Sequence, residues 1–346
     1  MNTNLRFGLI GCGTAGVFHA RSIEALDGLQ LYGVYDFSPE SSRRFAEQYG
    51  ARAFDTLEAL LACSEIDAVC ICTPSGLHAA QALAAIEKGK HVLIEKPLAT
   101  TVEDARRIVY AAEQAGVVVD VVAQLRLADS VCRIRKAIAD GELGKLTLCT
   151  LDMAYYRSEE YYTASAWRGT WKMDGGGALI NQGIHGMDLL LYLLGPVKSV
   201  SGLAKTLARP IETEDTAAAV LEFENGVLCC VSAATSVYPG SPRCLRLHGT
   251  KGSITLTEDT ITEWVMEGRP QEVCGVNGYS TFSSPETVPV NAHIRVVQDF
   301  ALAIRQNTAP VSTAADGFNA VSLIKTVYQA SQTGIPQIPA YIATNH

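Results

Sequence analysis

The sequence lacks the long apolar runs and the dense charge that mark several classes of protein. Charged residues make up 18% of its 346 positions and apolar residues 48%, whereas globular chains usually carry about a quarter charged residues. That balance excludes a disordered chain and a coiled coil laced with salt bridges. The longest apolar stretches, such as 189–194, fall far short of the roughly 20 residues that a membrane-spanning helix needs. The sequence therefore predicts a packed globular protein with no membrane partner.

A surplus of basic residues is also missing. Lys and Arg number 28 against 36 Asp and Glu, which gives a formal net charge of −8. Because nucleic acids are bound mainly through their phosphates, this balance excludes an extended nucleic-acid-binding surface. The first residues offer neither a secretory apolar core nor a cleavage site, so we expect the protein to stay in the cytoplasm.

Metal-binding motifs are absent from the sequence as well. The ten cysteines form no CxxC pair, no HExxH occurs, and no group of His and Cys shows the spacing of a zinc site. Cys70 and Cys72 lie inside an apolar run, so small buried thiols explain them better than disulfides or metal ligands. The sequence thus predicts no metal.

The order of apolar runs predicts an α/β protein of about two domains, as its length suggests. Up to residue 122, short apolar runs alternate with helical stretches, which is typical of a doubly wound parallel sheet. The expected strands are 5–10, 31–35, 68–72, 91–94 and 117–122, and the expected helices are 14–26, 39–49, 78–88 and 101–115. Ser38 before Pro39, and Gly50 after the last turn, are start and stop signals for one of these helices.

After residue 122 the pattern changes to longer alternating runs. Those at 146–155, 197–207, 217–223 and 227–234 predict strands of an antiparallel sheet, and helices are expected over 128–139 and, as one long element, over 178–194. Asn225 and Gly226, between two of the runs, are a strong hairpin signal. We therefore expect a dinucleotide-binding domain in residues 1–122 and a substrate-binding α/β domain in residues 123–346.

A glycine pattern follows the first expected strand and opens the first expected helix. In this GxGxxG, Gly11 permits a tight turn, Gly13 lets the backbone approach a pyrophosphate, and Gly16 lets helix and strand pack closely. The turn predicted to hold the cofactor comprises Gly11, Cys12, Gly13, Thr14, Ala15 and Gly16. Asp36 lies twenty residues beyond Gly16, at the end of the second strand, where a carboxylate accepts hydrogen bonds from the adenosine ribose hydroxyls.

The same aspartate bears on which dinucleotide is bound. The negative charge of Asp36 would repel a 2′-phosphate, and Phe37 rather than a basic residue follows it. NAD is therefore favoured over NADP. Arg43 and Arg44, on the next helix, leave NADP open as the alternative.

Lys96 stands in a Glu-Lys-Pro turn after the strand expected at 91–94, where doubly wound sheets bind their ligands. A lysine that is partly desolvated beside the positive nicotinamide ring would have a lowered pKa, which suits it to exchange a proton with a substrate hydroxyl. The alternative is a surface lysine paired with Glu95, and residue type alone favours that alternative.

A polar stripe lies on the apolar helix expected over 178–194. Asn181 and His185 are four residues apart and Asp188 is three further, so all three share one face of a regular helix. The three glycines at 175–177 would let a flat ring or a sugar approach the backbone. The alternative is a core histidine held by Asp188, but the amide and the glycines favour a site.

Aromatic and basic residues crowd the segment ahead of that helix, although aromatic residues make up only 7% of the chain. They are Tyr155, Tyr156, Arg157, Tyr161, Tyr162, Trp167, Arg168, Trp171 and Lys172. Aromatic faces pack on the C–H faces of sugars and cyclitols, and basic side chains bind hydroxyls or carboxylates. A subunit interface has the same composition, so both interpretations stay open.

Together these motifs resemble the Gfo/Idh/MocA family, named after glucose-fructose oxidoreductase, inositol dehydrogenase and MocA, over nearly the whole chain. The amino half shows AVCICTPSGLHA at 68–79 and EKPLA at 95–99, and the carboxyl half shows DGGGALINQGIHGMDLL at 174–190. Weaker signs are Asp299 with Phe300, Pro310, and Asp316 with Gly317. The resemblance implies a Rossmann domain followed by an α/β domain whose large open, mainly antiparallel sheet mediates homodimers or homotetramers.

The resemblance also implies roles for individual residues. Lys96 and His185 would handle the proton of the substrate hydroxyl. Many members carry Asp where this chain has Asn181, and because an amide accepts no proton, Asn181 is expected to orient a hydroxyl instead. The cofactor would be lined by Thr73, Pro74, His78, Glu95, Lys96 and Gln124, with Arg126 nearby. With the aromatic segment read as a binding surface, the substrate would be bound by Lys96, Tyr155, Arg168, Trp171, Asn181 and His185.

The function predicted from these residues and this resemblance is an NAD-dependent dehydrogenase that reversibly oxidises a secondary hydroxyl of a sugar, a sugar derivative or an inositol. Two alternatives stay open. One is an NAD-dependent glycosidase that uses transient oxidation and elimination, and the other is a non-catalytic, NAD-binding regulatory protein. The presence of both Lys96 and His185 counts against the second alternative.

Overall fold

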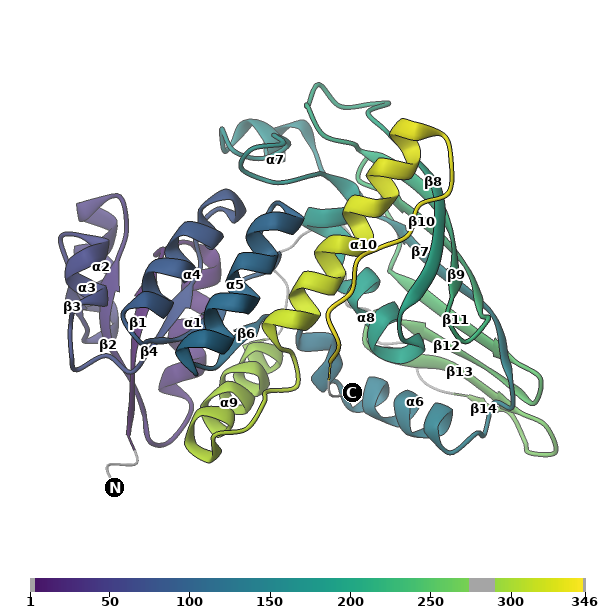
Figure 1. The fold of residues 1–346 in the computed structure, drawn as a ribbon, viewed down its shortest axis with the longest axis horizontal. Helices are drawn as coiled ribbons and strands as arrows, with labels where there is room; N and C mark the ends of the chain where they lie inside the picture. The colour runs from purple at the N-terminus through teal and green to yellow at the C-terminus, as the bar shows by residue number, and fades with distance from the viewer. Residues whose placement is uncertain (1–3, 274–289, 345–346) are drawn as a thin grey trace. The chain divides into compact units, whose positions relative to one another are not determined.

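The computed structural model describes residues 4–273 and 290–344, which form two compact units (Figure 1). The first unit comprises Met1–Gln124 and Pro289–Phe318, and the second comprises Leu125–Val288 and Asn319–His346. The first division falls close to the one expected between residues 122 and 123. However, a single boundary does not describe the chain, because residues 289–318 return to the first unit.

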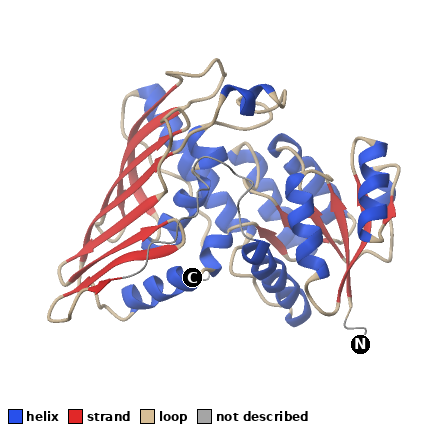
Figure 2. Ribbon diagram, turned by 180° about the vertical axis from the view of Figure 1, so that it is seen from behind, coloured by secondary structure: helices blue, strands red, loops and turns tan. Residues whose placement is uncertain are grey.

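The first unit contains a parallel sheet of six strands in the order β3-β2-β1-β4-β5-β6. The strands are β1 (Leu5–Ile10), β2 (Leu29–Tyr35), β3 (Arg52–Ala53), β4 (Ala68–Ile71), β5 (His91–Ile94) and β6 (Val119–Val121). Its helices pack against this sheet (Figure 2). This is the expected doubly wound sheet, and its order reverses between β1 and β4, where such folds bind ligands at the carboxyl ends of the strands.

Local signals fix the helices of the first unit. These are α1 (Thr14–Glu24), α2 (Pro39–Tyr49), α3 (Leu57–Leu61), η1 (Ser75–Leu77), α4 (His78–Glu87) and α5 (Val102–Ala115). The Ser38 hydroxyl accepts a hydrogen bond from the backbone N–H of Ser41, and Gly50 ends the same helix at a φ of 61°. Both signals for this helix are confirmed, since a side-chain oxygen satisfies a free N–H at the start and glycine adopts the left-handed turn at the end.

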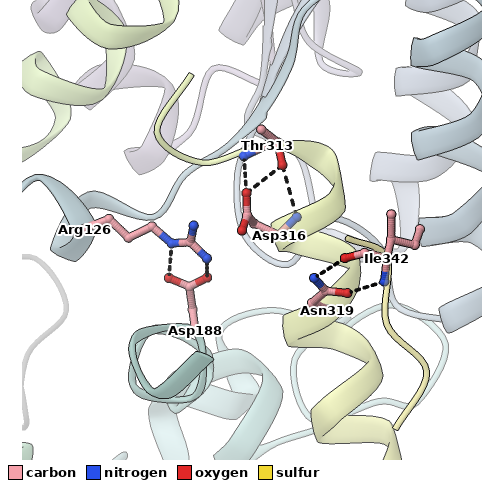
Figure 3. Close-up of polar contacts among 6 residues, drawn as sticks. All are labelled: Arg126, Asp188, Thr313, Asp316, Asn319 and Ile342. Atoms are coloured by element: carbon pink, nitrogen blue, oxygen red, sulfur yellow. Dashed lines mark hydrogen bonds and ion pairs between the residues drawn. The ribbon is translucent and has the colours of Figure 1, made fainter. Parts of the chain in front are cut away.

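The returning segment completes the first unit. Helix α9 (Val290–Gln306) packs against α1, and the Phe300 ring meets the Phe7 ring edge-on at a centroid distance of 6.2 Å. Helix α10 (Ala314–Thr333) begins here with a capping box: the Thr313 hydroxyl and N–H both donate to the Asp316 carboxylate, and the Asp316 N–H donates to that hydroxyl (Figure 3). Gly317 then faces Leu98 and Val121, where a Cβ would come within 2.9 Å of each side chain.

The second unit contains a sheet of eight strands within the described residues, in the order β14-β13-β12-β11-β7-β10-β9-β8. The strands are β7 (Leu146–Ala154), β8 (Val197–Lys205), β9 (Thr216–Phe223), β10 (Leu228–Ala234), β11 (Cys244–Gly249), β12 (Gly252–Thr257), β13 (Thr260–Met266) and β14 (Glu272–Val273). The hairpin signal is confirmed, because β9 and β10 pair antiparallel around Gly226. The sheet is mainly antiparallel as expected, but β7 and β10 run parallel.

One face of this sheet is covered and forms the core of the second unit. The helical elements are η2 (Gln124–Leu127), α6 (Asp129–Ala139), α7 (Glu159–Thr163), η3 (Ala178–Gln182), α8 (Ile184–Leu194) and most of α10. Side chains alternate along the strands, so Leu221 and Phe223 of β9 are buried while Val220 is half exposed on the other face. The Asn319 side chain on α10 exchanges two hydrogen bonds of 2.9 Å with the backbone of Ile342 and holds the last segment (Figure 3).

The helix expected over 178–194 is not one element, and this prediction is wrong. Residues Ala178–Gln182 form a π-helical turn, and α8 begins only after Gly183. A Cβ on Gly183 would meet the carbonyl oxygens of Ala178 and Leu179 at 2.9 and 3.0 Å, closer than van der Waals contact. A π turn contains about one residue more than a turn of α-helix. The spacing of four residues between Asn181 and His185 therefore does not place them on one face as it would in a regular α-helix.

Candidate active site

The glycine turn and Asp36 form a rigid corner of the first unit. One Asp36 carboxylate oxygen accepts a hydrogen bond of 2.8 Å from the Cys12 N–H, and the other accepts one of 2.9 Å from the Ser38 N–H. A Cβ on Gly16 would meet the Gly11 carbonyl oxygen at 2.4 Å, so only glycine allows this approach of helix and strand. Burial raises the pKa of the Cys12 thiol to about 12, and Asp36 adds to the effect, so this cysteine is no nucleophile at neutral pH.

The structure also shows which backbone groups can hold a phosphate. The N–H of Cys12 is already used by Asp36, whereas the first N–H groups of α1, which starts at Thr14, have no partner within the helix. A Cβ on Gly13 would meet nothing within 4 Å, so the space in front of the turn is open. The N–H groups at the start of α1 are therefore available to an anion, whereas that of Cys12 is already taken by Asp36.

His78 braces two turns at the carboxyl ends of β4 and β5. Its Nδ1 lies 2.8 Å from the Pro97 carbonyl oxygen and its Nε2 lies 2.8 Å from the Thr73 carbonyl oxygen. Burial lowers the pKa of the imidazole, although both carbonyls act in the opposite direction. The Thr73 hydroxyl donates to the Gln81 side chain. His78 thus positions the backbone of both predicted cofactor-lining turns.

The residues of the first unit fit a nicotinamide dinucleotide. The Asp36 carboxylate retains acceptor capacity for ribose hydroxyls, since each oxygen has accepted one backbone N–H. Gln124, three residues after β6 and the first residue of η2, keeps a buried side-chain oxygen that has no hydrogen-bond partner among residues 4–273 and 290–344. An amide oxygen of this kind matches the carboxamide of a nicotinamide, because a buried acceptor needs a donor.

Asn181 lies in a polar network within the second unit. Its side-chain N–H₂ donates to the buried Asp174 carboxylate, which also accepts a hydrogen bond of 2.9 Å from the Gly169 N–H. The Gln182 side chain donates to the Asn181 oxygen and to the Tyr161 hydroxyl, and Arg157 donates to Gln182 at 2.7 Å. These contacts fix the Asn181 amide in one orientation, as its expected role requires.

Close packing within the second unit explains two of the glycines before the π turn. A Cβ on Gly176 would meet the Tyr328 hydroxyl oxygen at 2.3 Å, and one on Gly177 would meet the Glu214 carbonyl oxygen at 1.9 Å. Glu214 is buried and its carboxylate accepts from the Gly177 N–H, the Leu179 N–H and the Tyr328 hydroxyl. Burial raises the Glu214 pKa, and these hydrogen bonds oppose the rise. Gly176 and Gly177 are therefore required by packing against Tyr328 and Glu214.

Asp188 is part of a buried ion pair. Both of its carboxylate oxygens accept hydrogen bonds from Arg126, at 2.9 Å from Nε and 2.7 Å from Nη2 (Figure 3). The Arg126 guanidinium also lies 4.8 Å from the centre of the Tyr192 ring. His185 is the second residue of α8 and is partly buried. The Arg126 partnership was not visible in the sequence, because 62 residues separate the two side chains.

The aromatic segment divides into a core part and a more exposed part. Tyr155 is buried in the core of the second unit, and this burial raises its pKa to about 12. The Arg168 guanidinium stacks 4.1 Å from the centre of the Tyr161 ring and donates to the Tyr161 carbonyl oxygen. Trp171 is 43% exposed and meets the Tyr328 ring edge-on. Trp171 is thus accessible from solvent, whereas Tyr155 is enclosed in the core.

Three features of the site escaped the sequence interpretation. Lys325 of α10 donates to the Gly175 carbonyl oxygen, and burial lowers its pKa to about 8. Asp174 orients Asn181. His19 and His293 flank Glu95 in the first unit. Asp174 had a sequence signal, its place directly before the glycines, and His19 lies three residues after Gly16 on the helix that the glycine turn opens. No sequence pattern marks Lys325 or His293.

Comparison with known proteins agrees with this geometry. A family model for an oxidoreductase family with an NAD-binding Rossmann fold matches residues 5–123, and a model for the GFO/IDH/MocA C-terminal domain matches residues 131–255. These matches and the site define an oxidoreductase that acts on CH–OH groups with a nicotinamide dinucleotide, NAD, as its cofactor. The chain belongs to the Gfo/Idh/MocA family.

Several relatives match nearly the whole chain. A 1,5-anhydro-D-fructose reductase of Ensifer adhaerens is 30% identical over 95% of this chain and 97% of its own length. The scyllo-inositol 2-dehydrogenase (NADP(+)) IolW of Bacillus subtilis is 27% identical over 95% and 94%. The structure of the WlbA dehydrogenase from Bordetella pertussis, in complex with NADH and UDP-GlcNAcA, is 33% identical with a TM-score of 0.89 and covers 99% of both chains.

No helix in the described ranges is long and apolar enough to cross a membrane.

Proposed function

We propose that the protein interconverts a secondary hydroxyl and a ketone on a sugar, a sugar derivative or an inositol, with NAD preferred over NADP. Lys96 and His185 handle the hydroxyl proton, and Asn181 orients the substrate. The observation that carries this proposal is the fixed Asn181 amide, whose N–H₂ is held by the buried Asp174. Because an amide exchanges no proton, the acid and base must be other residues.

The preference for NAD rests on Asp36. Its carboxylate is anchored through both oxygens to the backbone of the glycine turn and of α2, so it cannot swing away from a bound adenosine. A 2′-phosphate would meet this negative charge. Phe37 is 95% exposed and offers no cation in its place. The relative IolW carries NADP(+) in its name, so the preference is a property to be measured for each chain.

The substrate class follows from the surroundings of Asn181 and from the relatives. The relatives are named for an anhydro sugar and an inositol, and the WlbA dehydrogenase structure contains UDP-GlcNAcA. Trp171 presents a half-exposed aromatic face, and the stacked Arg168 guanidinium supplies donors for hydroxyls. We propose both as substrate-binding residues, with Tyr155 supporting them from the core.

In the proposed reaction, bound NAD would supply the acceptor for a hydride from the carbinol carbon. Lys96 accepts the hydroxyl proton, with His185 as the second proton carrier, and Asn181 fixes the hydroxyl by hydrogen bonds. His78 contacts the Pro97 carbonyl oxygen and so positions the turn that contains Lys96. The proton moves in the opposite direction when the ketone is reduced.

We further propose that a second copy covers the free face of the sheet in the second unit, giving a homodimer or homotetramer. Exposed apolar side chains gather there in register: Leu148 is opposite Leu228, and Val220 is opposite Cys230 on the neighbouring strands. Leu203 on β8 extends the patch. An apolar face of this kind is typical of an interface between subunits.

The proposed function is tested with Lys96→Ala and a panel of sugars, sugar acids, nucleotide sugars and inositols, each with NAD and with NADP. Absorbance of the reduced cofactor is expected with the wild type on at least one polyol, and not with Lys96→Ala, while NADH binding is retained. Unchanged turnover in Lys96→Ala would remove this lysine from the mechanism. Release of an aglycone without accumulation of NADH would indicate the glycosidase, and binding without turnover on every compound would indicate a regulatory protein.

A further inference from the structure

Three titratable side chains from distant parts of the sequence meet at the carboxyl end of β5. His19 on α1 places Nε2 at 2.9 Å from an oxygen of Glu95, and His293 on α9 places Nε2 at 3.7 Å from the same oxygen. Both imidazoles are buried and the carboxylate is nearly so. The His293 ring also stacks on Phe18 at a centroid distance of 5.0 Å. All three residues belong to the first unit.

The contacts keep Glu95 ionised. Burial by itself raises the pKa of a carboxyl group, but the hydrogen bonds and charges of the two imidazoles hold the pKa of Glu95 well below its usual range. Each imidazole can donate an N–H from Nε2 to the carboxylate. Glu95 is therefore a buried anion held from two helices.

The same three side chains could in principle ligate a metal ion, since their donor atoms lie within 4.8 Å of one another. The rest of the cluster argues against it. A histidine that binds a metal almost always donates its other ring N–H to a partner. The Nδ1 atoms of His19 and His293 are buried and have no hydrogen-bond partner in the part of the chain that the structure describes. The geometry fits hydrogen bonding to a carboxylate better.

The position of the cluster connects the two cofactor turns. His19 lies three residues after Gly16, in the helix that opens with the glycine turn, and Glu95 directly precedes Lys96. A shift of α1 relative to β5 would lengthen the 2.9 Å contact between His19 Nε2 and the Glu95 carboxylate. Because α9 adds the second imidazole, the turn bearing Lys96 is tied to two helices at once.

We propose that Glu95 is a positioning residue whose carboxylate, shared by His19 and His293, fixes the cofactor helix relative to the Glu-Lys-Pro turn, so that cofactor affinity and turnover both depend on these imidazoles. The turnover part rests on the proposed role of Lys96. The cofactor-affinity part does not, and it is measured separately.

The test compares four variants by NADH fluorescence titration, steady-state kinetics and thermal melting. Glu95→Gln keeps the size of the side chain and removes its charge, His19→Leu removes the donor, and His19→Gln keeps an N–H at a similar reach. His248→Gln, on β11 of the second unit, is the matched control, because its imidazole Nδ1 lies 2.9 Å from the Ser253 hydroxyl and it belongs to the other unit.

Glu95→Gln and His19→Leu are expected to weaken NADH binding and to lower kcat by about tenfold or more, whereas His19→Gln and the control stay within about threefold of the wild type. If His19→Leu does not fold, the comparison of Glu95→Gln with His19→Gln decides. Wild-type affinity in Glu95→Gln would overturn the proposal, as would equal damage from His19→Gln and His19→Leu. Stoichiometric zinc in the purified wild type that is lost in Glu95→Gln would also overturn it, in favour of a metal centre. If Lys96→Ala loses turnover but keeps its affinity for NADH, the weakened NADH binding of Glu95→Gln does not depend on the role of Lys96 in the reaction.

Discussion

The buried pair between Arg126 and Asp188 gives a prediction whose size follows from its geometry. The two hydrogen bonds are 2.9 and 2.7 Å long, and the side chains are only 2% and 9% exposed. Replacing one partner of such a pair leaves an uncompensated buried charge, which costs about 3–5 kcal/mol. Asp188→Asn keeps one acceptor oxygen, so we expect a loss near the lower end, about 3 kcal/mol in the free energy of unfolding of the second unit.

Urea unfolding followed by tryptophan fluorescence is a suitable assay. The chain has three tryptophans, at 167, 171 and 264, and all belong to the second unit, so the signal reports that unit. The double variant Arg126→Met with Asp188→Leu removes both charges and should recover most of the loss, because the penalty comes from the unpaired charge. A loss below about 1 kcal/mol in Asp188→Asn, at an unchanged urea dependence, would refute the reasoning, and so would a double variant that loses more than the single one.

Three further predictions concern the cofactor, pH and assembly. Asp36→Ala should raise the KM for NAD by about tenfold or more and relax the discrimination against NADP, because charge-assisted hydrogen bonds to the ribose are lost; an unaltered cofactor ratio would contradict the ribose assignment. Burial disfavours the Lys325 ammonium and lowers its pKa in the folded protein to about 8, below the usual 10.5. Burying the charged lysine therefore costs up to about 3 kcal/mol of folding stability below pH 8. This cost is relieved between pH 8 and 10.5. Lys325→Met should therefore be more stable than the wild type at pH 7, with a difference that shrinks towards pH 10 in thermal melts; a pH-independent difference would count against the buried ammonium. Val220→Glu places a charge in the apolar sheet face and should reduce the mass measured by light scattering to that of the monomer; an unchanged mass would move the interface elsewhere.

Much of the first unit could be predicted because its signals are local. The strands 5–10 and 91–94 have the expected bounds. The Thr101 side chain accepts from the Asp104 N–H at the start of α5, as the spacing of the two residues predicts. The glycine turn and Asp36 lie where the pattern placed them, since each depends on a few neighbouring residues.

The remainder depends on contacts between distant residues. Hydrophobic alternation predicts strands but not their partners, so the parallel pairing of β7 and β10 was not visible. The break at Gly183 was missed because the apolar pattern of 178–194 is continuous, while the hydrogen bond from the π turn to Glu214 involves a residue 35 positions away. No pattern predicts that His293 meets Glu95, since nearly 200 residues lie between them.

The return of residues 289–318 to the first unit has a consequence for how the protein is made. Phe300 and His293 complete contacts with Phe7 and Glu95, which are synthesised far earlier. When residues 1–124 have left the ribosome, helix α1 therefore still lacks its contacts with α9, which has not yet been synthesised. We expect the first unit to remain incompletely packed until most of the second unit has been translated. A fragment ending at Gln124 should bind cofactor poorly, and adding a peptide that spans α9 should restore part of that binding.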